Sequence, residues 1–131
     1  MATNIRIIHA HDFIRVTPDG RLDLETSKRL LAEVATAAGP LHDYEILVDT
    51  RKAQPEMSIG DLWYLATDTW YLAAKLVNAR GRFPKKTAVL CPLQRFDHAS
   101  FFALCAQNTG LNVQAFSSFE DAIEWLIASS T

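Results

Sequence analysis

Ser58 is the first residue whose type and position suit chemistry. It stands at the expected start of a helix, with Gly60 two residues on and Asp61 three residues on. A serine at that position caps the helix through its hydroxyl group. A phosphate on the same hydroxyl would lie at the positive end of the helix dipole, beside free backbone N–H groups. Ser58 therefore has two interpretations, a structural N-cap and a candidate phosphate acceptor.

A second polar group follows a run of three apolar residues, where Asp49 and Arg51 end a predicted strand. In open α/β sheets, ligands bind beyond the carboxyl ends of the parallel strands. The alternative interpretation is an ion pair of Asp49 with Arg51 or with Arg15. We expect a ligand or partner pocket at this edge of the sheet, lined by Asp49, Arg51, Ser58 and Gly60.

Other reactive residues give weaker patterns. His9 and His11 would share one face of a strand, but structural zinc normally needs four ligands. An enzyme would require a cluster such as Cys91, Asp97 and His98 to converge in one cleft, and no sequence motif supports this. We predict no catalytic residue, no metal and no cofactor.

The aromatic residues of the second predicted helix, at about 58–78, are more informative. Its apolar arc spans roughly 200°, which is wider than the ~100° that a core-facing helix needs. Trp63 and Trp70 lie on one shoulder of this arc, and Trp125 widens the apolar side of the last helix. Either the chain covers these rings itself, or they form an interface. A third alternative is a cavity for an apolar ligand, lined by Trp63, Trp70 and Leu65.

Hydrophobic periodicity predicts the elements that position these residues. Two neighbouring strands open the chain, and three helix–strand units and a last helix follow, in the order β-β-α-β-α-β-α-β-α. This order predicts a single mixed, mostly parallel five-stranded sheet with helices on both faces. We expect turns or loops at residues 18–20 and 52–57. Strands are predicted at 4–9, 13–17, 45–49, 87–91 and 112–116, and helices at about 25–38, 58–78, 97–108 and 118–128.

Length and charge limit the function classes. The 131 residues suit one domain, residues 1–131, and carry a net charge of −2. This charge predicts no nucleic-acid partner, and no apolar run approaches the roughly 20 residues of a membrane span. We interpret the basic residues Arg80, Arg82, Lys85 and Lys86 as a solvated loop. The cysteine pattern and the lack of a visible signal peptide favour the cytoplasm.

Three stretches resemble STAS domains, the family that includes anti-sigma factor antagonists of the SpoIIAA type. Residues 20–26 (GRLDLET) are similar to the family's G-x-L-D turn before its first helix. Residues 46–49 precede the Met57–Gly60 start of the second helix, and residues 101–113 form an apolar helix before the last strand. The resemblance implies the SpoIIAA-like fold, which is related to lipid-binding CRAL-TRIO (Sec14-like) domains.

The same resemblance implies a role for Ser58. Phosphorylatable members of the family read D-S-[ST]-G at this helix start, and a partner kinase that is also an anti-sigma factor modifies the first serine. Ser58 and Gly60 match the acceptor serine and the glycine, whereas Met57 and Ile59 replace the other two residues.

The leading hypothesis is a non-catalytic bacterial STAS-like module that acts through protein–protein association. We expect a homodimer with Trp63, Trp70 and Trp125 as interface candidates, and the protein partner would be of the anti-sigma or kinase type. The alternative is a carrier or sensor of a small apolar, lipid-like ligand held between the second helix and the sheet. An enzyme is the third alternative.

Overall fold

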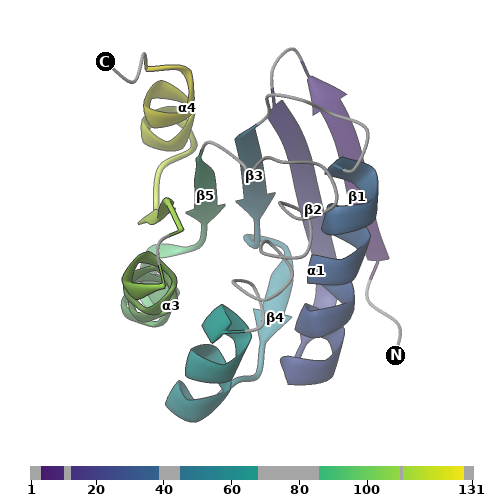
Figure 1. Ribbon diagram of the computed structural model, residues 1–131, viewed down its shortest axis with the longest axis vertical. Coiled ribbons are helices and arrows are strands. Elements are labelled where there is room, and N and C mark those ends of the chain that lie inside the picture. Colours follow the sequence, from purple (N-terminus) through teal and green to yellow (C-terminus); the bar gives the residue numbers. More distant parts are fainter. Residues whose placement is uncertain (1–3, 11–12, 39–44, 68–85, 110, 129–131) are drawn as a thin grey trace.

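The computed structural model describes residues 4–10, 13–38, 45–67, 86–109 and 111–128. After two opening strands, helices and strands follow one another along the chain, with the short β4 inserted after β3 (Figure 1). The elements are β1 (Asn4–Ala10), β2 (Phe13–Leu22), α1 (Leu24–Ala38), β3 (Glu45–Asp49), β4 (Ala53–Pro55), a helix over residues 59–67, β5 (Thr87–Leu90), the 3-10 turn η1 (Leu93–Arg95), α3 (Phe96–Asn108), β6 (Val113–Phe116) and α4 (Phe119–Ile127).

The sheet has the predicted mixed architecture. Its strands follow the order β1-β2-β3-β5-β6, in which β1 pairs with β2 in antiparallel orientation. The pairs β2–β3, β3–β5 and β5–β6 are all parallel. The prediction of a mostly parallel sheet of five strands in this element order is confirmed, with the short β4 added at its margin.

The predicted turn at residues 18–20 is wrong, because β2 continues through these residues to Leu22. Pro18 pairs with Ile5 of β1, at a point where the ladder between β2 and β3 has already ended at Val16. Proline, which has no N–H to donate, is tolerated in a strand at such an unpaired side. Gly20 then adopts a φ of 103°, a left-handed conformation that bends the strand.

The predicted loop at residues 52–57 is also wrong in part. After the bend, β2 pairs with β4 in parallel orientation, and Gly20 lies opposite Ala53. The backbone N–H of Glu56 continues this contact by donating to Leu22 O at 2.9 Å. Three residues are too few for a periodic pattern to reveal a strand.

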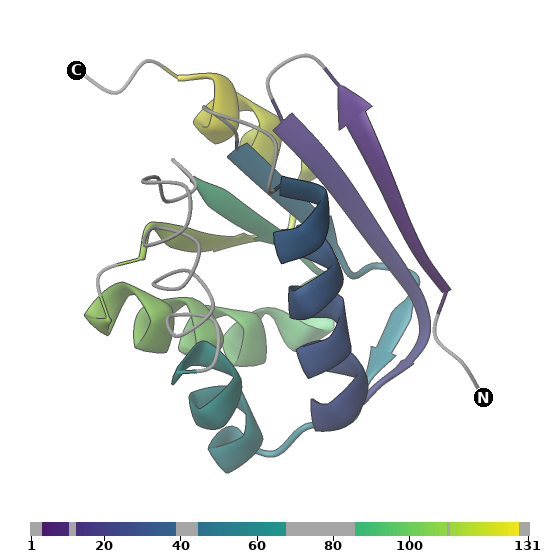
Figure 2. The ribbon, with the colours of Figure 1, turned by 45° about the vertical axis from the view of Figure 1, so that its right-hand side comes forward.

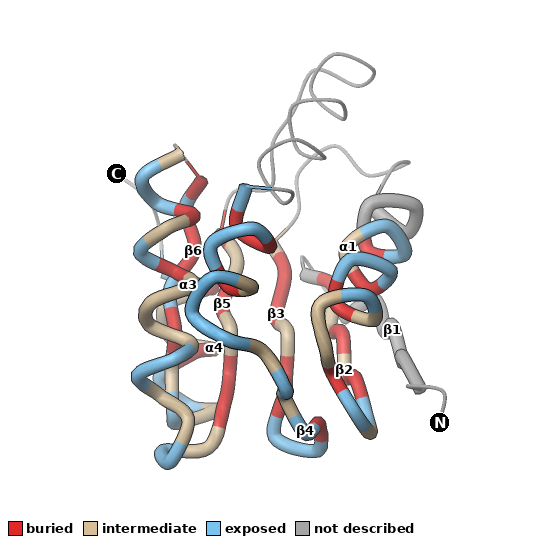
Figure 3. The backbone as a smooth tube through the Cα atoms, turned by 90° about the horizontal axis from the view of Figure 1, so that it is seen from below, coloured by how far each residue is buried: buried red, intermediate tan, exposed pale blue. Residues whose placement is uncertain are grey.

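Helices cover both faces of the sheet, as predicted. Helix α1, the helix at 59–67 and α3 pack on one face, and α4 packs on the other (Figure 2). The alternation of β3 separates the two sides, since Ile46 packs beneath α1 and Leu47 beneath α4. The helices are buried toward the sheet and exposed on their outer sides (Figure 3).

Candidate functional site

The helix at 59–67 begins with a reciprocal cap. Ser58 Oγ accepts a hydrogen bond from Asp61 N at 3.1 Å, and Asp61 Oδ2 accepts one from Ser58 N at 3.1 Å. This capping box satisfies two backbone donors that the first turn of the helix leaves without partners. Gly60 is helical, and a Cβ there would meet only Ser58 Oγ at 3.8 Å, so the position does not require glycine. Ser58 is therefore the N-cap of this helix, as its position in the sequence predicted.

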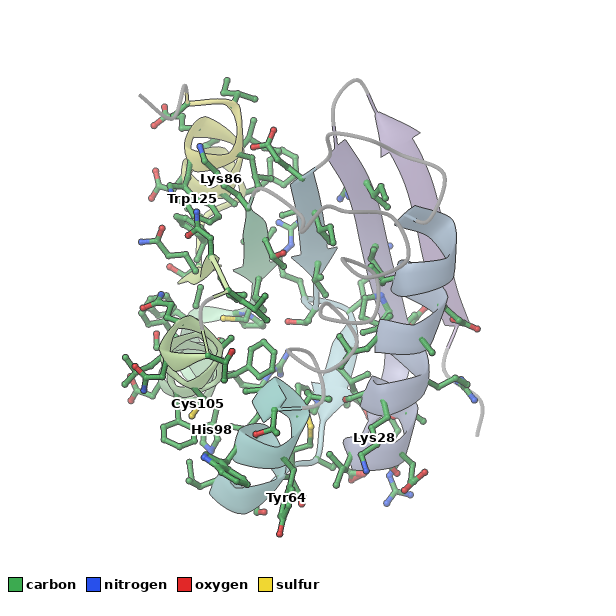
Figure 4. All side chains as sticks on the ribbon, in the orientation of Figure 1. Lys28, Tyr64, Lys86, His98, Cys105 and Trp125 are labelled. Atoms are coloured by element: carbon green, nitrogen blue, oxygen red, sulfur yellow. The ribbon has the colours of Figure 1, made fainter. Side chains whose placement is uncertain are left out.

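The two sides of this helix differ in burial. Leu62, Leu65 and Ala66 are buried toward the protein core. Trp63 keeps 52% of its surface exposed, and Tyr64 keeps 59%. Their rings contact each other edge to face with centroids 5.2 Å apart, and Tyr64 lies on the outer side of the molecule (Figure 4).

Ile59 stands one turn before Trp63 and is also 52% exposed. Residues four apart lie on one helix face, which places Ile59 beside Trp63, and the ring contact adds Tyr64. We call these three exposed residues the aromatic surface. Contiguous exposed apolar patches larger than roughly a few hundred Å² are rare on monomeric proteins and mark interaction sites. Trp70, the other aromatic candidate of this helix, lies outside the described residues.

Trp125 is held differently, because it is half-buried against the core beneath α4. Its ring packs on Phe116 with centroids 5.5 Å apart, and Lys86 Nζ lies 5.5 Å from its centroid. Figure 4 shows Lys86 and Trp125 side by side. Most of this side chain therefore serves the protein's own core.

Lys86 is buried, which contradicts the interpretation of this residue as part of a solvated loop. Its Nζ donates to the backbone oxygens of Trp125 and Ala128, both at 2.7 Å. These carbonyls end α4, where the helix dipole favours a positive charge. The other basic residues of that loop lie outside the described residues.

Asp49 is the centre of the polar group at the end of β3. The buried carboxylate accepts from Arg51 Nε at 2.9 Å, Arg51 Nη2 at 2.8 Å and Arg51 N at 3.1 Å. Arg15 of β2 adds Nη2 at 3.2 Å. Burial alone would raise the pKa of Asp49, but these hydrogen bonds outweigh it and hold the pKa below its usual value. The same contact raises the pKa of Arg51.

The structure does not join the four residues of the expected pocket into one group. Asp49 and Arg51 bond to each other, whereas Ser58 and Gly60 lie at the start of a helix that packs on the opposite face of the sheet from α4. No hydrogen bond or ion pair among the described residues connects Ser58 with Asp49 or Arg51. A shared pocket for all four residues stays a prediction.

Phe119, the first residue of α4, belongs to the Asp49 group. Its ring lies 5.3 Å from the guanidinium carbon of Arg15 and 5.7 Å from that of Arg51. The sequence contained one signal for part of this group. Arg15 stands between the apolar residues Ile14 and Val16, so the alternation of a strand places it on the opposite face of β2 from them. Nothing in the sequence linked Phe119 to it.

The candidate enzyme residues occupy different environments. Cys91 is buried, and burial raises the pKa of its thiol although Arg95 opposes the shift. Asp97 and His98 are exposed in the first turn of α3. Within the described ranges, no group of three or more His, Cys, Asp or Glu residues could hold a metal ion. In the same residues, no helix has the length and apolar character needed to cross a membrane.

Comparison with solved structures identifies the fold. The chain is similar to an uncharacterized protein of the DUF3478 family from Shewanella loihica PV-4, which has a SpoIIAA-like fold, with a TM-score of 0.55 and 18% identity over 95% of this chain and 93% of that one. It also resembles the anti-sigma factor antagonist SpoIIAA in its unphosphorylated form, with a TM-score of 0.50 and 14% identity over 98% of this chain and all of the other. This chain has a SpoIIAA-like fold. No family model and no curated protein sequence matches it.

The turn before α1 also fits the stretch that pointed to this SpoIIAA-like fold. Gly20 supplies the left-handed conformation, and Asp23 Oδ1 accepts from Thr26 N at 2.9 Å to cap the helix. Hydrogen bonds from Thr26 lower the pKa of Asp23. Gly20, Asp23 and Thr26 of this stretch therefore serve to shape the chain before α1 and to cap that helix.

Proposed function

We propose that this chain is a non-catalytic STAS-type module that works by protein–protein association, and that it forms a homodimer through the aromatic surface Ile59, Trp63 and Tyr64. One observation supports this proposal most directly. Three large apolar side chains on one helix are each more than half exposed, although the same helix buries Leu62 and Leu65 in the core. Covering such side chains would contribute roughly 25 cal/mol for each Å² of apolar surface removed from water.

The aromatic surface also suits a partner because it is already ordered. The capping box of Ser58 and Asp61 fixes the first turn, and the edge-to-face contact restrains Trp63 and Tyr64. Ordered side chains lose less entropy on binding than mobile ones. Trp125 is the weaker interface candidate because Phe116 and Lys86 already cover much of its ring.

The protein's oligomeric state at micromolar concentration tests the proposal. Light scattering after size-exclusion chromatography should give the mass of a dimer, and Trp63→Ala should weaken the dimer about tenfold or more, since tryptophans dominate many interfaces. Ile127→Ala is the matched control, because Ile127 is 70% exposed on α4. A monomeric wild-type protein, or equal weakening by both variants, would contradict the proposed interface.

Ser58 is a candidate site for regulating this association. It is exposed at the edge of the aromatic surface, and the Asp61 carboxylate accepts from its backbone N–H. A phosphate on Ser58 would break the cap and place a dianion beside that carboxylate. We therefore expect modification to loosen the first helical turn. Native mass spectrometry of protein from its own cells would reveal both the oligomer and an added phosphate.

The same measurement tests the alternative role as a carrier of a small apolar ligand. In the helix at 59–67, Trp63 and Leu65 point to different sides, one exposed and the other buried. They are therefore poor candidates to line one cavity together. A co-purifying lipid mass on the monomer would favour the carrier and would count against the dimer. We expect the protein to act in the cytoplasm.

A further inference from the structure

Two arginines converge on a single carboxylate at the sheet face that α4 covers. Arg15 lies near the start of β2, Asp49 is the last residue of β3, and Arg51 follows in the turn after it. Phe119 begins α4 and lies within 6 Å of both guanidinium carbons. We call Arg15, Arg51 and Phe119 the arginine cluster.

Both oxygens of the Asp49 carboxylate already accept two hydrogen bonds each, and its single negative charge cannot neutralise both Arg15 and Arg51. Its two oxygens accept four N–H donors, three of them from Arg51 and one from Arg15. Two positive charges against one negative charge leave a local excess of one positive charge. In the described part of the chain, Asp49 is the only ion-pair partner of either arginine.

Both arginines retain donors and access to solvent. A guanidinium carries five N–H donors, of which Arg15 gives one and Arg51 two to Asp49. Arg15 Nε is buried and has no acceptor among the described residues. The side chains are nevertheless 36% and 44% exposed as a whole, which leaves the ends of the two guanidinium groups, though not Arg15 Nε, open to an anion from outside.

Other charges in the vicinity do not cancel this excess by direct contact. Glu120 and Asp121 follow Phe119 in the first turn of α4, where both are exposed to solvent. The backbone N–H of Asp121 is bonded to the cap residue Ser118, which fixes this turn. The arginine cluster therefore lies beside an ordered helix start at the carboxyl edge of the sheet, where α/β proteins place their ligands.

We propose that the arginine cluster binds an oxyanion, namely the phosphate or carboxylate group of a small ligand. The remaining guanidinium N–H groups of Arg15 and Arg51 donate to the anion's oxygens, and the Phe119 ring holds both guanidinium groups in place. Planar guanidinium groups match the oxygen spacing of carboxylate and phosphate. Asp49 acts as a positioning residue, because it fixes the two arginines without contacting the anion.

An NMR titration with sodium phosphate, sodium acetate and sodium chloride at matched ionic strength tests this proposal. We expect saturable shifts of the Nε–H signals of Arg15 and Arg51 and of the Phe119 amide with phosphate or acetate, and none with chloride. Stronger binding of phosphate would assign a phosphate ligand, and stronger binding of acetate a carboxylate ligand. Shifts that are equal for all three salts, an adventitious ion only, would overturn the proposal.

Variants separate this site from general charge effects. Arg15→Gln should weaken binding about tenfold, because charge-assisted hydrogen bonds are lost. Arg29→Gln, which removes the same charge from the exposed side of α1, should leave the affinity unchanged. If Arg15→Gln does not fold, Arg15→Lys keeps the charge but loses the planar donors, and it should still weaken binding severalfold. Equal affinity in wild type and Arg15 variants would refute the site.

Discussion

Asp49 is buried, and yet it remains charged because arginines surround it. Its pKa is lowered by hydrogen bonds from Arg51 and Arg15 despite the opposing effect of burial. A carboxyl group whose folded pKa lies below its unfolded value stabilises the fold above the unfolded value. That stabilisation is lost as the pH falls through the lower, folded value.

Asp49→Asn should therefore destabilise the protein in a pH-dependent way. We expect a loss of about 2 kcal/mol at neutral pH, because the amide cannot accept charge-assisted hydrogen bonds as strongly. The difference from wild type should shrink as the pH falls below the ordinary aspartate value of 3.8. Urea unfolding of both proteins between pH 7 and pH 2 measures this difference. A gap of constant size across the range would contradict our account of Asp49.

Ser58 offers a second prediction for a single residue. Ser58→Ala removes the hydroxyl that accepts from Asp61 N, and it should lower the free energy of unfolding by about 1 kcal/mol. Ser58→Thr keeps the acceptor and serves as the control. Denaturant unfolding measures both variants. If alanine costs no more than threonine, the cap contributes nothing measurable to the fold.

At the scale of elements, Lys86 connects the start of β5 with the end of α4. Lys86→Met keeps an apolar side chain of similar length but removes both hydrogen bonds to the terminal carbonyls of the helix. We expect faster hydrogen exchange at the Leu126 and Ala128 amides and a loss of roughly 1–3 kcal/mol in stability. Lys52→Met, at an exposed position, should leave both unchanged. Unchanged exchange in Lys86→Met would show that α4 does not depend on this contact.

The elements that the sequence predicted well are those whose own residues determine them. The apolar run at 46–48 indicated a strand covered on both faces, and Ser118 indicated the cap of α4, where its Oγ accepts from Asp121 N. The elements that sequence reasoning missed depend on distant partners. Pro18 lies in a strand because β1 pairs with it, and β4 exists because β2 bends at Gly20 to meet it.

The candidate site follows the same rule. Ser58 and Asp61 are three residues apart, so their mutual cap could be predicted from spacing. Asp49 and Arg51 are neighbours, and their pairing was one of the predicted alternatives. Phe119 and Lys86 could not be assigned, because their contacts join residues far apart in sequence. The outward direction of Trp63 depended on which side of its helix meets the sheet, and periodicity alone left that open.

For the whole molecule, the pairing of the strands sets the folding time. Among the paired strands of the described residues, only β1 and β2 are close in sequence, whereas Ile14 pairs with Ile46 and Val48 with Val89. Such pairs require long segments to close before any contact forms, which slows folding. We expect refolding on the order of milliseconds to seconds. Stopped-flow tryptophan fluorescence measures it, and complete refolding within microseconds would contradict this expectation.

The contact of Lys86 with the end of α4 has a consequence for synthesis on the ribosome. Residues Leu47, Ala88 and Leu90 are made before the helix that covers them, and Lys86 is made before its two acceptor carbonyls. Until α4 has left the exit tunnel, the apolar side chains on that face of the nascent sheet remain uncovered, and the Lys86 ammonium group lies beside them without its acceptors. A nascent chain stalled just short of α4 would thus expose apolar surface that is prone to aggregation and is a target for chaperones.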